Sequence, residues 1–187
     1  MTLKEMKIKV LGMIEELNPN SELLTDDPDI SAKINEVINQ VMFRLARAKK
    51  IARYVKMEVS AGDLIDFADI EKKVGNEVYQ VALIAGVNYT VKADGTVFKI
   101  LESGTAEIDC FVYPERITDT TTDKAYEFEL SPDVLEIMPY GVAADLLKSD
   151  KSAEYGNVYA TWYQSLLQTL DPRNTITSIY IDGGYSL

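Results

Sequence analysis

Apolar residues recur every three or four positions in three parts of the chain: 2–17, 28–50 and 134–173. This spacing places them on one face of an α-helix, so each part should form at least one helix with a buried side. The predicted buried positions of the first two helices are Leu3, Met6, Val10, Ile14 and Leu17, and then Ile30, Ile34, Val37, Ile38, Val41, Leu45 and Ala48.

The ends of these two helices carry their own signals. Thr2 and Glu5 have the spacing of a capping box, in which each side chain binds a free backbone amide at the helix start. Pro19 should end the first helix. Asp27 is a good N-cap for the second helix, with Pro28 at the first helical position.

Residues 134–173 predict a helical hairpin, around which the rest of the chain is organised. Pro139 lies inside its first arm and should kink that helix, or start the longer piece after a short leading turn. Ser149 and Asp150 are candidate N-caps for the second arm. Pro172 should stop that arm, because the residue before a proline is driven out of the α region.

The second arm of the hairpin has an aromatic stripe that includes the only tryptophan of the chain. Aromatic side chains dominate cores and interfaces, so the stripe predicts either core packing or a surface reserved for a neighbouring subunit. Its residues are Tyr155, Tyr159, Trp162, Leu166 and Leu170.

Between the helical parts, the apolar period changes to two, which is typical of strands. Asp94-Gly95 supplies the residues of a tight hairpin turn between two of them. These strands should form a small, mostly antiparallel sheet. The predicted strands are residues 54–59, 78–81, 87–91, 97–101 and 106–113.

The sequence therefore predicts an α+β fold in a single domain, residues 1–187. A bundle of two N-terminal helices (1–52) and a C-terminal helical hairpin (131–173) would carry an inserted antiparallel sheet (53–130) and an extended C-terminal arm (174–187).

Composition narrows the chemistry. The chain has a net charge of −11, one cysteine and no histidine. Without histidine there is no Ser-His-Asp triad, Cys-His pair or imidazole zinc site, so an enzyme would have to use carboxylates, lysine or tyrosine. We expect no enzyme, no cofactor and no metal. Cys110 shares one strand face with Ile108 and Val112, which indicates a buried thiol.

No stretch approaches 18 uninterrupted apolar residues, and the N-terminus lacks the apolar core of a signal peptide. We therefore expect no membrane segment and a cytoplasm-like compartment. A cluster of acids could in principle bind magnesium, but on an extended segment its members would not converge, so a solvated acidic edge is favoured. The cluster is Asp63, Asp66, Asp69 and Glu71.

Positive charge gathers at the end of the second helix and just beyond it. It could be a solvated helix end that complements the helix dipole, or an assembly surface for an acidic partner or nucleic acid. We predict that reversing Arg47 and Lys50 to Glu weakens association and leaves the fold intact. The candidate assembly surface is Arg44, Arg47, Lys49, Lys50, Arg53 and Lys56.

The last fourteen residues, 174–187, are too apolar for a purely solvating tail. Alternation allows them either to dock on a neighbouring subunit or to complete the protein's own sheet. The glycine pair permits a sharp change of direction. The candidate docking arm is Ile176, Ile179, Tyr180, Ile181, Gly183 and Gly184.

The segments PYGVAADLLKSD, YGNVYATWYQSLLQTLDPR and IYIDGG follow an ADGTVFKI hairpin in the chain. With the order helix, helix, inserted sheet, helical hairpin and tail, they make most of the chain resemble the head–tail connector (adaptor or head-completion) proteins of tailed phages and prophages. The sizeable β insertion sets it apart from the minimal helical-bundle members.

This resemblance implies a structural subunit without a cofactor. Such proteins form a ring, typically dodecameric, beneath the portal protein, line the DNA channel and bridge it to the next connector or tail protein. The implied location is the head–tail junction of the virion, after synthesis in the bacterial cytoplasm. The acidic net charge suits a channel that DNA passes without sequence-specific binding. The alternative is a soluble binding module whose β insertion recognises a protein or a carbohydrate.

Overall fold

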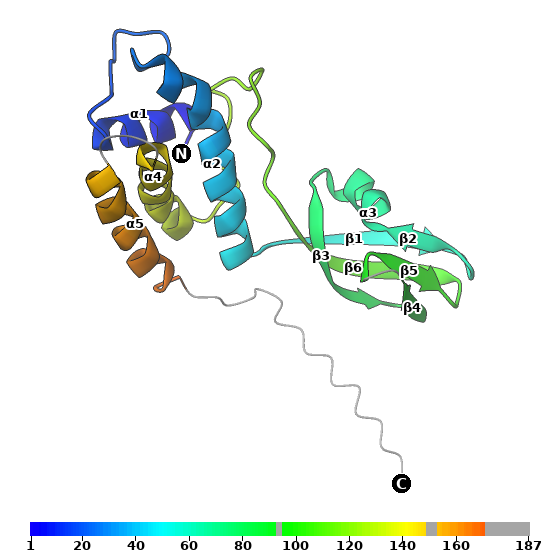
Figure 1. Ribbon diagram of the computed structural model, residues 1–187. Coiled ribbons are helices and arrows are strands. Elements are labelled where there is room, and N and C mark those ends of the chain that lie inside the picture. The colour runs from blue at the N-terminus through cyan, green and yellow to red at the C-terminus, as the bar shows by residue number, and fades with distance from the viewer. Residues whose placement is uncertain (93–94, 149–152, 171–187) are drawn as a thin grey trace.

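The computed structural model describes residues 1–92, 95–148 and 153–170, and shows an α+β chain whose described part has two lobes (Figure 1). A helical lobe stands beside a β lobe, which also carries a short helix. The chain enters the β lobe directly after α2 and returns to α4 through residues 113–131. The helices are α1 (Leu3–Met13), α2 (Pro28–Ala48), α3 (Phe67–Val74, in the β lobe), α4 (Pro132–Leu147) and α5 (Ala153–Leu167).

The described strands form two antiparallel sheets rather than the single sheet predicted from the sequence. The first has the order β1 (Ile51–Val59), β6 (Gly104–Val112), β3 (Val78–Ala85). The second has the order β2 (Leu64–Asp66), β5 (Val97–Ile100), β4 (Tyr89–Lys92). The predicted β4–β5 hairpin is confirmed, with Gly95 at φ +91°.

The predicted helix starts are confirmed in the helical lobe. Thr2 and Glu5 form the reciprocal capping box at α1, and the Asp27 side chain accepts backbone hydrogen bonds at the start of α2. The predicted end of the first helix is wrong, because α1 stops at Met13. Gly12 has a low helix propensity, and Glu15 takes a left-handed φ of 61°, which a continuing helix cannot contain.

α4 is the central helix of its lobe, in contact with α1, α2 and α5. It continues through Pro139, so the predicted separate leading turn is not formed. Gly141 explains the close packing. A Cβ atom at this position would lie 2.8 Å from Tyr163 of α5 and 2.9 Å from Val41 of α2, which is closer than carbon atoms approach.

Helix α3 was not predicted from the sequence, which indicated an extended acidic segment there. The Asp66 side chain accepts a hydrogen bond from the Asp69 backbone amide, and the Asp69 side chain accepts one from the Asp66 backbone amide. This reciprocal pair starts the helix. Gly75 ends it in the left-handed conformation, at φ +80°. The aspartate pair replaces the Ser/Thr…Glu/Gln form of a capping box, and for this reason it gave no clear signal.

Buried apolar side chains in the described residues form two clusters, one in each lobe. The helical-lobe cluster is built around Met6, Met42 and Met138. The β-lobe cluster includes Ile108 and Cys110, so the predicted burial of the thiol is confirmed. None of the described helices has both the length and the apolar character needed to cross a membrane.

Candidate functional site

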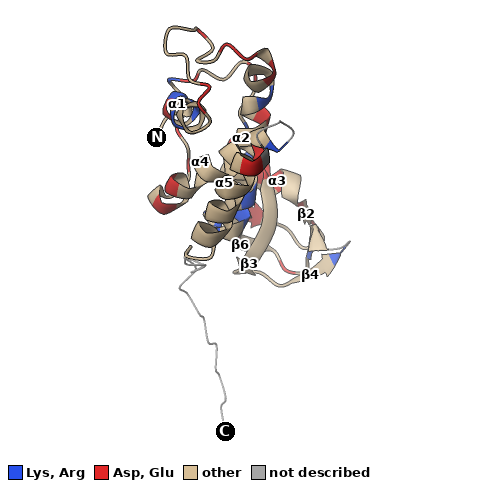
Figure 2. Cartoon of the chain, turned by 60° about the vertical axis from the view of Figure 1, so that its left-hand side comes forward, with Lys and Arg blue, Asp and Glu red and all other residues tan. Residues whose placement is uncertain are grey.

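The six cations of the candidate assembly surface lie along the end of α2 and the following β1 strand, where the lobes join (Figure 2 colours the charged residues). Each contacts a polar group of the same chain. Four form ion pairs and two donate hydrogen bonds to neutral groups. The pairs are Arg44–Asp145, Lys49–Asp133, Arg53–Glu129 and Lys56–Glu107, and the two other contacts are Arg47–Tyr113 and Lys50–Gln80.

The positive surface is therefore largely balanced by acids from α4, β6 and the segment before α4. The Lys56 ammonium lies 2.7 Å from Glu107, and this hydrogen bond raises the pKa of Lys56 above its usual value. The side chains of Lys56 and Arg44 nevertheless remain 58% and 49% exposed. Among the four cations in ion pairs, only Lys56 and Arg44 keep about half of their side-chain surface free for a partner. We call these two the outer cations.

An aromatic cluster joins the two lobes at the same place. Tyr113, just after β6, lies with its ring centroid 4.8 Å from that of Phe43 on α2 and 4.7 Å from that of Tyr79 on β3. The Tyr79 hydroxyl donates a hydrogen bond of 3.0 Å to the Ala46 carbonyl of α2. Burial raises the pKa of Tyr79 to about 12, so this hydroxyl remains a donor at neutral pH.

Two of the predicted assembly cations belong to this joint. The Arg47 guanidinium lies 5.4 Å from the centre of the Tyr113 ring, and the Lys50 ammonium lies 4.4 Å from that of Phe111. Such cation–π contacts stabilise the packing of α2 against the β lobe. Within the described structure, Arg47 and Lys50 hold the lobes together, so reversing their charges would also disturb this joint.

No protein-family model matches the chain, and no curated protein does either.

The aromatic stripe of the second hairpin arm is only partly in the core. Tyr155 is 69% exposed and Trp162 is 54% exposed, whereas the neighbouring Tyr163 is buried against α2 and α4. Leu170 is buried as predicted. The interpretation of the whole stripe as core packing is therefore wrong for Tyr155 and Trp162, its two exposed residues. α4 packs instead against the neighbouring face of α5, which carries Tyr163. The apolar spacing alone did not show which of the two faces would be buried.

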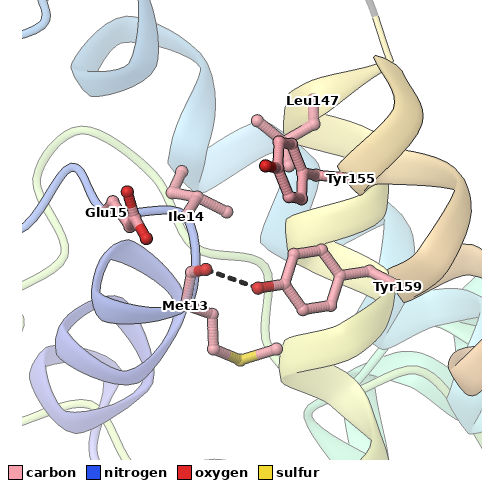
Figure 3. A pocket seen from close by; sticks show the side chains of 6 residues that line it. All are labelled: Met13, Ile14, Glu15, Leu147, Tyr155 and Tyr159. Atoms are coloured by element: carbon pink, nitrogen blue, oxygen red, sulfur yellow. Dashed lines mark hydrogen bonds between the residues drawn. The ribbon is translucent and has the colours of Figure 1, made fainter. Parts of the chain in front are cut away.

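Tyr155 and Tyr159 line a hollow between α5 and the end of α1 (Figure 3). The Tyr159 hydroxyl donates a hydrogen bond to the Met13 carbonyl, which lies at the C-terminal end of α1. The hollow has a volume of about 240 Å³, and its other lining residues are Ile14, Glu15 and Leu147. It offers a mixed polar and apolar contact surface without a charged pair that could perform acid–base chemistry.

The acidic residues of the β lobe have local structural roles. Asp66 and Asp69 cap α3, and Asp63 and Glu71 accept backbone hydrogen bonds from Ser60 and Val78. A hydrogen bond from Lys72 lowers the pKa of Asp69. The described residues contain no group of three or more acids, cysteines or histidines able to hold a metal ion.

Two candidates remain: the Cys110 thiol, which the structure describes, and the docking arm, which it does not. Burial raises the pKa of the Cys110 thiol, which keeps the nucleophilic thiolate scarce at neutral pH. The candidate docking arm, residues 174–187, lies outside the described residues. The candidate site is therefore a set of contact surfaces: the outer cations beside the joint and the exposed face of α5.

Proposed function

We propose that this chain is a structural head–tail connector subunit that forms a ring below a phage portal protein. It would bridge the portal to the next connector or tail protein and line the channel through which DNA passes. In this proposal the chain works without catalysis or a cofactor. It is made in the bacterial cytoplasm and incorporated at the head–tail junction of the virion.

The observation that carries the proposal is exposed apolar surface on both lobes. Tyr155, Val158 and Trp162 are more than half exposed on α5, and Leu64 and Leu101 are more than half exposed in the β lobe. Large exposed apolar side chains mark protein contacts when they gather on one surface. A ring subunit needs two different contact surfaces, because each copy meets one neighbour on each side.

The proposal also includes a finer arrangement of the fold. The two N-terminal helices and a C-terminal helical hairpin form one bundle, the β lobe is inserted between them, and an extended arm follows. The contacts of α4 with α1, α2 and α5 support the bundle. The net charge of −11 supports a channel wall, because a surface that neutralises few phosphates lets DNA pass without tight binding.

Mass measurement tests the proposal directly. The chain, purified alone and after mixing with a phage portal protein, should change from a small species into a portal-bound ring. Connector rings can require the portal as a template, so a monomer in isolation is compatible with the proposal. A mixture in which the chain and the assembled portal remain separate species at low salt would contradict it.

A second candidate is a binding module whose β lobe recognises another protein. The exposed Leu64 and Leu101 favour this candidate. Leu64 lies opposite Lys99 across β2 and β5, and Leu101, two residues after Lys99, faces the same side, so both leucines lie on one surface. Replacing both leucines with serine should abolish binding in this case. The same variant should still bind the portal if α5 supplies the connector contact.

The outer cations allow a charge test that leaves the joint intact. Exchanging the paired charges, Lys56→Glu with Glu107→Lys, preserves an ion pair between β1 and β6, so the melting temperature should change little. If an acidic partner contacts Lys56, association should weaken at low salt, and the difference should fade as salt screens it. Unchanged association at low salt would show that Lys56 lies outside the interface.

A further inference from the structure

The exposed face of α5 combines aromatic side chains with an almost complete lack of charge. Between Ala153 and Leu170, Glu154 is the only charged residue, although the chain as a whole is strongly acidic. Tyr155, Val158 and Trp162 are 69%, 51% and 54% exposed. Three large apolar residues at helical spacing, with neutral polar neighbours, form a continuous contact strip rather than scattered surface residues.

A hollow adjoins each end of this strip. At one end Tyr155 closes the hollow beside α1, which has a volume of about 240 Å³ (Figure 3). At the other end Trp162 and Leu166 line a second one of about 370 Å³ with Tyr140 of α4. The Trp162 and Tyr140 ring centroids are 5.7 Å apart, so the tryptophan ring packs against a neighbouring helix. The strip is therefore a shaped surface with an aromatic side chain supported by α4 near one end.

We propose that, in the unassembled chain, residues 174–187 of the same molecule cover this strip. The segment is the protein's own C-terminal part, which follows α5 in the sequence. Covering the strip would keep free subunits from associating through it before a partner is present. The inference concerns the free chain alone and does not depend on whether the chain forms a ring.

The chemistry of the segment matches that of the strip. Ile176, Ile179, Tyr180 and Ile181 supply apolar surface, and Asp182 is the only charged side chain in 174–187. A neutral apolar segment loses little hydration of charges when it covers a neutral aromatic surface. Burial of its isoleucines would stabilise the contact by the ordinary hydrophobic effect.

The lengths also agree. Residues 176–181 span about 17 Å in an extended conformation. Leu166 follows Tyr155 by eleven positions, which corresponds to about 17 Å along a helix. The five residues 171–175 can bridge up to roughly 20 Å, which is enough for the apolar run to return over α5 from its C-terminal end.

Tethering decides which molecule supplies the segment. A segment joined to α5 by a short connection meets that helix at an effective concentration in the millimolar range, well above the concentration of free subunits in a dilute solution. Closing so short a loop adds little entropic cost. The chain's own segment should therefore occupy the strip before the segment of a second copy can.

Trp162 provides a direct probe, because it is the only tryptophan and lies inside the strip. We would compare the full chain with a chain that ends at Asn174, measuring the emission maximum and quenching by acrylamide. In the full chain the emission should lie at shorter wavelength and quenching should be weaker. Both properties should be independent of protein concentration. Adding a peptide of residues 174–187 to the shortened chain should restore protection.

A matched pair of full-length variants separates docking from loss of length. Ile179→Ser with Ile181→Ser should expose Trp162 to acrylamide as the shortened chain does. Thr175→Ser with Thr177→Ser makes equally many changes in the same segment and should leave quenching weak. Circular dichroism must be the same in all forms, so that a change in quenching reports the contact rather than unfolding.

Two results would overturn the inference. Equal quenching of the full and shortened chains would show that the segment leaves Trp162 uncovered. Protection that grows with protein concentration would show that a second copy covers the strip. Either result is independent of portal binding, so it would leave the proposed connector function to its own mass measurement.

Discussion

Replacing Gly141 with valine is expected to destabilise the helical lobe by about 3 kcal/mol, because overpacking a close-packed core forces side chains and backbone to shift. Even the first added carbon atom would lie 2.8 Å from the Tyr163 ring and 2.9 Å from Val41. Both neighbours are buried, so neither can move into solvent. For a chain of this size the melting temperature should fall by roughly 6–12 °C.

The matched control is Gly12→Val in α1, where the nearest atom to an added Cβ, on Leu17, is 4.0 Å away. This position is also helical, but it has space, so the same substitution should change the melting temperature little. Thermal unfolding followed by circular dichroism measures both variants. Equal effects at the two positions would show that helix propensity, rather than the contact of α4 with α2 and α5, determines the result at Gly141.

The sequence predicted best those features that depend on neighbouring residues. The Thr2–Glu5 capping box, the Asp27 N-cap of α2 and the β4–β5 hairpin all depend on signals within a few residues, and the structure confirms them. The end of α1 and the existence of α3 were missed, although their signals are also local. Gly12 and the Asp66–Asp69 pair are weaker forms of the usual boundary residues.

The candidate site depended on contacts between distant parts of the chain, which periodicity does not contain. The cluster of cations was visible in the sequence, but its acids lie far away in sequence: Asp145 is about a hundred residues from Arg44. For α5, the aromatic spacing indicated an apolar stripe but not which flank α4 would cover. The structure places Tyr163 inside and Trp162 outside, which turned a predicted core element into a candidate contact surface.

A chain shortened to end at Asn174 should keep its stability and lose its assembly. Residues 175–187 contribute several large apolar side chains to the predicted docking arm. If a partner buries even two of the isoleucines, at about 2 kcal/mol each, their removal should weaken association by roughly a thousandfold. If the arm acts only between molecules and does not pack on α5 of its own chain, the shortened chain should lose at most about 1 kcal/mol of stability, and its melting temperature should change by no more than ~4 °C.

The measurement is mass after mixing with the portal protein, beside thermal unfolding of each chain alone. A shortened chain that unfolds or aggregates on expression would show that the arm completes its own domain, and one that assembles normally would show that the arm is dispensable. The Trp162 experiment probes a different state, the free chain. An arm that leaves Trp162 unprotected but is required for portal binding would overturn docking on α5 and support this prediction. Protection of Trp162 together with normal assembly of the shortened chain would support docking on α5 and contradict this prediction, because the arm would then cover α5 without binding the partner.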